Sequence, residues 1–184
     1  MLRGNRELWL AFLATILITG LYGVVLFYTR EVSPASELFG HGIGIVGFIL
    51  MLMTETLYSL RKRSRSVKWG RMSTWLQLHI FTGLVGPYMV LLHTSWKFNG
   101  IAGVTTLFTI IIVISGFIGR YIFTRIPRTM DGLEIEGGIS QETLRQARRL
   151  MALWHTIHIP IGMALFVSAF VHIGAALYYG TLLK

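Results

Sequence analysis

The chain has 184 residues, of which 53% are hydrophobic and 14% are charged, and its formal net charge is +9. A soluble domain of this length would carry about 25% charged residues, whereas a mean hydropathy of +0.61 is typical of an integral membrane protein. The sequence has no cysteine, which excludes disulfides, thiolate-bound metals and iron–sulfur clusters.

Five apolar stretches are each long enough to cross a hydrocarbon core of about 30 Å as a helix. The predicted spans are residues 8–28, 38–60, 72–96, 101–123 and 153–179. We therefore expect an all-α transmembrane bundle of five spans that forms a single integral membrane domain over residues 1–184. The first span follows Arg3 and Arg6, as in a signal peptide, but its apolar run is too long for one and favours a retained anchor.

Basic residues are distributed unevenly between the predicted loops. With the N-terminus inside and the C-terminus outside, fourteen of the seventeen lie on inner segments, as the positive-inside rule predicts. These fourteen are Arg3, Arg6, Arg61, Lys62, Arg63, Arg65, Lys68, Arg71, Arg120, Arg125, Arg128, Arg145, Arg148 and Arg149. The expected location is a bacterial inner membrane. Nucleic-acid binding is not expected, because no recognition motif accompanies the positive charge.

Residues 124–152 form the largest predicted loop, which lies on the inner side. Residues 131–138 are rich in glycine, and Ser140 is a suitable N-cap for a short helix. In the segment 140–150, the apolar side chains share one side and the arginines face elsewhere (Leu144, Ala147 and Leu150; Arg145, Arg148 and Arg149). We expect this amphipathic segment to lie in the inner interface of the membrane.

Four of the six histidines form a repeated pattern on the third and fifth spans. His79 and His93 are fourteen residues apart, and so are His158 and His172. Fourteen residues of α-helix rise about 21 Å and return a side chain to within about 40° of its starting face. Ionisable groups inside a membrane are costly and usually functional, and imidazole is a common axial ligand of haem iron. The spacing predicts two haems, which must be of the non-covalent b type because covalent attachment needs cysteine.

The third and fifth spans are separated by one span and therefore run parallel. We expect His79 and His158 to bind the inner haem iron, and His93 and His172 to bind the outer one. The second ring nitrogen of each ligand should donate to a carbonyl or hydroxyl group. The sequence offers three hydroxyl candidates for this role, which are Thr82, Thr94 and Ser168.

Glycines accompany the histidines on both spans. Gly83 and Gly162 each follow an inner histidine by four residues, and Gly86 lies midway between His79 and His93. A missing side chain at these positions would leave room for a flat macrocycle. The alternative is that the glycines are helix-packing positions, which are common in membrane bundles.

This pattern of two H-x13-H pairs on two parallel spans resembles the di-haem core of membrane cytochromes b. The resemblance is to the cytochrome b of quinol-oxidising bc complexes and to the ferric-reductase-like transmembrane domain. It covers about residues 71–179, and all four histidines match position by position. The sequence has no Pro-Glu-Trp-Tyr quinol-oxidation motif and no flavin- or nicotinamide-binding domain, and its five spans are fewer than in a full bc-type cytochrome b. The resemblance therefore implies a haem core and electron transfer without naming a substrate.

Several other polar residues are candidates for contacts with a quinone or a haem propionate. They are His41, His155, Glu55, Arg71 and Arg120. A structural role is equally expected for the two histidines. His155 is also an alternative haem ligand, but it lies seventeen residues from His172, so His158 matches the third span better. The carboxylate can instead relay protons or pair with an arginine. Cations suit propionates, but interfacial snorkelling is the stronger expectation for the two arginines. Tryptophans near the span ends predict an interface belt (Trp69, Trp75, Trp96 and Trp154).

Three functions are compatible with the sequence. The first is the membrane cytochrome b subunit of a respiratory or photosynthetic redox complex, which exchanges electrons with a quinone or soluble carrier and with partner subunits. The second is a self-contained transmembrane oxidoreductase that reduces quinone, ferric iron or oxygen. The third is a cofactor-free anchor whose basic inner face docks proteins or anionic lipids. The four matched histidines favour the first, in which the chain is an electron-transfer subunit and its own enzymatic activity is left open.

Overall fold

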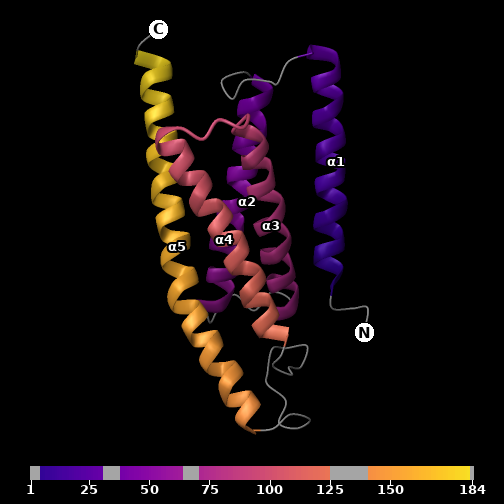
Figure 1. The fold of residues 1–184 in the computed structure, drawn as a ribbon, viewed down its shortest axis with the longest axis vertical. Helices are drawn as coiled ribbons and strands as arrows, with labels where there is room; N and C mark the ends of the chain where they lie inside the picture. The colour runs from indigo at the N-terminus through magenta and orange to yellow at the C-terminus, as the bar shows by residue number, and fades with distance from the viewer. Residues whose placement is uncertain (1–4, 31–37, 64–70, 125–140, 183–184) are drawn as a thin grey trace. The chain divides into compact units, whose positions relative to one another are not determined.

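The computed structural model describes residues 5–30, 38–63, 71–124 and 141–182, and within them every regular element is helical. The helices are α1 (Arg6–Thr29), α2 (Leu38–Arg63), α3 (Met72–His93), α4 (Gly100–Thr124) and α5 (Gln141–Leu182) (Figure 1). All five are long and apolar enough to cross a membrane. The predicted all-α, multi-pass membrane architecture is therefore confirmed.

The helices form two compact units, one containing α1, α2 and α3 and the other containing α4 and α5. In the first unit α2 and α3 pack along their lengths, and α1 lies against α3. The hydroxyl groups of Thr19 on α1 and Tyr88 on α3 form a hydrogen bond, and Tyr22 of α1 stacks on Phe39 of α2. In the second unit α4 packs against α5.

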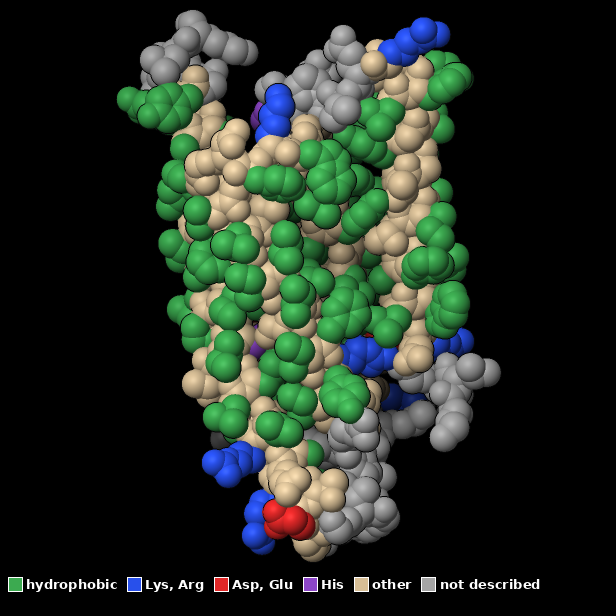
Figure 2. All heavy atoms as spheres, viewed as in Figure 1, with side chains coloured by type: hydrophobic (Ala, Val, Ile, Leu, Met, Phe, Trp, Pro, Cys, Tyr) green, Lys and Arg blue, Asp and Glu red, His purple; other side chains and the backbone are tan. Residues whose placement is uncertain are grey.

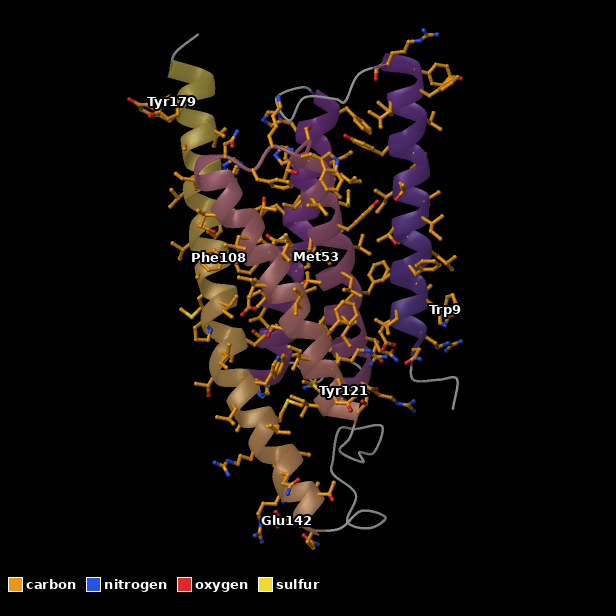
Figure 3. All side chains as sticks on the ribbon, in the orientation of Figure 1. Trp9, Met53, Phe108, Tyr121, Glu142 and Tyr179 are labelled. Carbon is orange, nitrogen blue, oxygen red and sulfur yellow. The ribbon has the colours of Figure 1, made fainter. Side chains whose placement is uncertain are left out.

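Large apolar side chains are exposed on the outward faces of the helices. On α1, for example, Leu17 is 64% exposed and Phe27 is 78% exposed. Figure 2 shows hydrophobic side chains covering the helix surfaces in view, while Lys and Arg side chains gather near helix ends. Trp9 and Tyr179 point outward near the ends of α1 and α5 (Figure 3). Extensive apolar exposure of this kind fits contact with lipid.

Helix α5 is longer than the predicted fifth span. It contains 42 residues, about 63 Å of helix, and joins the predicted segment 140–150 to the span 153–179 without a break. No glycine or proline lies between Gln141 and Ile159, and Met151 and Ala152 are strong helix formers. The two-sided pattern of the segment is present, because Leu144 and Ala147 are buried and its three arginines are exposed, although Leu150 is also exposed. Ser140 and residues 131–138 lie outside the described residues.

Helix α3 ends three residues before the predicted limit of the third span. His93 is its last residue, and Thr94 follows as the C-cap. Ser95 and Trp96 then adopt φ angles of 48° and 61°, a left-handed conformation that an α-helix of L-residues cannot continue. The second histidine of α3 therefore stands at the end of its helix.

Candidate functional site

The contact between α2 and α3 repeats every seven residues along both helices in opposite directions. The facing pairs are Gly40 with His93, Gly47 with Gly86, and Thr54 with His79. Seven residues are nearly two helical turns, so each step brings the same face into contact. The fourteen-residue spacing of the histidines on α3 is thus matched by fourteen residues between their partners on α2.

His79 reaches across to the main chain of α2. Its Nδ1 lies 2.9 Å from the carbonyl oxygen of Thr54. A carbonyl oxygen can only accept, so Nδ1 is the donor and the lone pair of the neutral imidazole is on Nε2. Beside this bond, the hydroxyl oxygens of Thr54 and Thr82 are 2.7 Å apart, and Thr82 is buried. His79 therefore has a defined tautomer and lies beside a buried, hydrogen-bonded threonine pair.

His93 repeats this arrangement at the other end of the α2–α3 contact. Its Nδ1 lies 2.8 Å from the carbonyl oxygen of Gly40, which again makes Nδ1 the donor. The ring packs on Gly44, where an added Cβ would lie 2.7 Å from the Cγ of His93. The exposed ring of His41 is nearby, with a centroid distance of 6.0 Å. Any side chain at position 44 would displace this imidazole.

Gly83 and Gly86 of α3, which were predicted to leave room for a haem, both face α2. A Cβ on Gly86 would lie 2.9 Å from the carbonyl oxygen of Gly47, and one on Gly83 would lie 3.3 Å from the Cγ2 of Thr54. The helix-packing alternative therefore accounts for both positions within the first unit. In the second unit, a Cβ on Gly162 would lie 3.8 Å from Ile112, which is an ordinary contact. A role for the three glycines beside a macrocycle stays a prediction.

In the second unit, α4 holds His158 of α5. The Nδ1 of His158 lies 2.9 Å from the hydroxyl oxygen of Ser115. The indole of Trp154 stacks on the imidazole, with ring centroids 4.5 Å apart and an interplanar angle of 29°. The indole N–H donates to the main-chain oxygen of Ser115 at 2.7 Å and to its hydroxyl at 3.1 Å. His172 lies half-buried fourteen residues further along α5.

The hydroxyl groups expected to orient the histidines are engaged elsewhere. Thr82, Thr94 and Ser168 donate to carbonyls of their own helix, on Leu78, Leu91 and Leu165 respectively. Serine and threonine in helices commonly bond the carbonyl three or four residues earlier. The Nδ1 atoms of His79 and His93 bond main-chain carbonyls of α2, the other kind of partner that was expected. Trp154 packs on His158, and its place in an interface belt stays a prediction. Trp69 lies outside the described residues.

The remaining candidate residues have varied surroundings. His155 donates from Nδ1 to the carbonyl of Met151 in its own helix, at 3.0 Å. Glu55 is exposed and accepts a hydrogen bond of 3.4 Å from the Ser59 hydroxyl. The arginines lie near helix ends, Arg71 exposed before α3 and Arg120 half-buried in α4. Contacts of these residues and of His41 with a quinone or a propionate stay predictions.

No cluster of three or more His, Cys, Asp or Glu side chains in the described part of the chain is placed to hold a metal ion. A haem iron with two histidine ligands needs no such cluster. A scan against models of protein families found no match, and searches of curated proteins and of solved structures found none either. The fold defines the chain as a multi-pass helical membrane protein with histidines oriented by neighbouring helices.

Proposed function

We propose that the chain is a membrane electron-transfer protein that binds two b-type haems through His79, His93, His158 and His172. The observation that carries the proposal is the shared tautomer of His79 and His93, each donating Nδ1–H to a carbonyl of α2. Ligating histidines almost always donate their other ring N–H in this way, which fixes the ring and raises its basicity. Both rings are thereby held with the lone pair on Nε2, as iron ligands need to be.

The four proposed ligands are imidazoles, which have the donor chemistry that a b-type haem requires. Neutral imidazole is a usual axial ligand, and the lone pairs of His79 and His93 are on Nε2, opposite the hydrogen-bonded nitrogen. The pairing of His79 with His158, and of His93 with His172, rests on their spacing in the sequence. A bound haem would supply one-electron redox chemistry, while the chain supplies ligands, apolar burial and hydrogen bonds that tune it.

Electrons would pass between two sites about 21 Å apart along α3, the rise of fourteen helical residues. The charge distribution supports an orientation with His79 and His158 towards the inner side of a bacterial membrane. The proposed role is that of a cytochrome b subunit in a respiratory or photosynthetic complex. Its partners would be a quinone or a soluble carrier together with other subunits.

The test is an absorption spectrum and haem count on the full chain purified in detergent. We expect a low-spin b-type spectrum, about two haems per chain and two steps in a redox titration. His93→Ala should remove one haem and leave the other. One haem or none in the unaltered protein would contradict the proposal, and a colourless preparation would support a cofactor-free anchor. Sustained oxidation of an added quinol by the isolated chain, with oxygen or ferric iron as the electron acceptor, would favour a self-contained oxidoreductase.

A further inference from the structure

His79 and His158 occupy corresponding positions in the two units but have different hydrogen-bond partners. His79 bonds a main-chain carbonyl on the preceding helix, which can only accept. His158 bonds the hydroxyl of Ser115 on the preceding helix, which can either accept or donate. The tautomer of His158 therefore depends on whether the Ser115 hydroxyl accepts a hydrogen bond from Nδ1 or donates one to it.

Trp154 contacts both Ser115 and His158. Its indole N–H is shared between the main-chain and hydroxyl oxygens of Ser115, and its ring lies nearly parallel to the imidazole. The indole fits because position 119 has no side chain, since a Cβ there would overlap the ring atoms Cε2 and Cζ2 of Trp154. One lone pair of the hydroxyl oxygen thus accepts from the indole, and a second can accept from the imidazole.

We infer that Ser115 and Trp154 are positioning residues that hold His158 in the tautomer with the proton on Nδ1 and its lone pair on Nε2. The part of this inference that concerns iron ligation rests on the proposed function. Donation from Nδ1 would give His158 the tautomer that His79 and His93 already have. It would also place the basicity of this ligand under the control of one side chain, which a main-chain carbonyl does not allow.

Nitrogen NMR of the haem-free full chain in detergent, labelled with 15N-histidine, tests the tautomer directly. We expect a protonated Nδ1 on His158 in the unaltered protein. Ser115→Ala should shift the tautomer ratio towards protonated Nε2 by about fivefold, because it removes one hydrogen bond. Ser168→Ala removes a hydroxyl that bonds only within α5 and should leave the ratio unchanged. A protonated Nε2 in the unaltered protein would overturn the inference.

The contribution of Trp154 is tested without touching either hydrogen-bonding side chain. Gly119→Ala places a methyl group on the indole and should shift the Trp154 indole N–H signal and the His158 ratio together. Gly116→Ala is the matched control, since a Cβ there meets nothing within 4 Å. An unmoved indole signal in Gly119→Ala would contradict the positioning role.

The haem-loaded protein gives a separate readout. Ser115→Ala should keep both haems and raise the midpoint potential of one, because a less basic ligand stabilises ferric iron less well. Both potentials remaining unchanged would contradict control of the ligand by Ser115. A chain that binds no haem, yet gives the expected NMR result, would contradict the proposed function and support the positioning of His158.

Discussion

Gly47 and Gly86 meet backbone to backbone, and a Cβ on either would lie 2.9 Å from the carbonyl oxygen of the other. They stand midway between the two imidazole–carbonyl hydrogen bonds of the first unit, seven residues from the partner on each side. This close approach of α2 and α3 is what lets both rings reach main-chain oxygens. Helix packing and histidine orientation are therefore one property of the same contact.

Adding a methyl group at this crossing should destabilise the first unit. In Gly47→Ala the new Cβ would meet the main-chain nitrogen of Val90 as well as the oxygen of Gly86, at 3.0 and 2.9 Å. Main-chain atoms cannot move aside as a flexible side chain can, so we expect a loss of about 1–3 kcal/mol. Reversible unfolding in mixed detergent measures it. Gly23→Ala on α1, where a Cβ meets nothing within 4 Å, should not lower stability.

The register of α2 against α3 can be tested by cross-linking, because the chain has no cysteine of its own. The hydroxyl oxygens of Thr54 and Thr82 are 2.7 Å apart, and a disulfide joins sulfur atoms at about 2.05 Å. The double variant Thr54→Cys, Thr82→Cys should therefore form an internal disulfide on mild oxidation, seen by mass spectrometry. Thr56→Cys with Thr82→Cys is the control, since Thr56 is exposed and bonds within its own helix. Equal cross-linking of the two pairs would mean that the register is wrong.

Gly44 should be required for the position of His93. In Gly44→Ala the Cβ would lie 2.7 Å from Cγ and 2.8 Å from Nδ1 of the imidazole, so the ring must leave the Gly40 carbonyl. On the proposed function we expect loss of one haem of two, with the other retained, by absorption spectroscopy. Gly42→Ala, two residues away with nothing within 4 Å of its Cβ, should keep both. If both variants retain two haems, His93 does not need this packing to bind iron.

Much of the architecture was predictable from the sequence, because a helix that spans a membrane needs about 20 consecutive apolar residues and such stretches are easily recognised. Each of the five helices that could span a membrane overlaps a predicted span, although α5 begins twelve residues before the fifth one. The histidine spacing predicted facing pairs on α3 and α5 and did not indicate that both imidazoles of α3 bond carbonyls of α2. The end of α3 was missed by three residues. The cause is the left-handed backbone at Ser95 and Trp96. Serine and tryptophan do not favour that conformation, so the sequence did not predict the helix end there.

The partners of the histidines were not predictable, for a physical reason. The partners of His79 and His93 are the main-chain carbonyls of Thr54 and Gly40. Every residue of a helix has such a carbonyl, so the residue type does not show which one accepts the hydrogen bond. Gly42 and Gly44 are likewise indistinguishable by type, and only the packing of His93 separates them. Ser115 was a findable exception, since a serine inside an apolar span is a possible partner for an intramembrane histidine.

His155 and His158 lie one turn apart on α5 and should respond differently to substitution. The Nδ1 of His155 donates to Met151 of its own helix, whereas the Nδ1 of His158 bonds Ser115 of α4. On the proposed function, His158→Ala should remove one haem because an iron ligand is lost, and His155→Ala should retain both. Haem content and the low-spin spectrum measure this difference. Loss of haem in His155→Ala, with retention in His158→Ala, would instead assign the ligand to His155 and break the fourteen-residue match with α3.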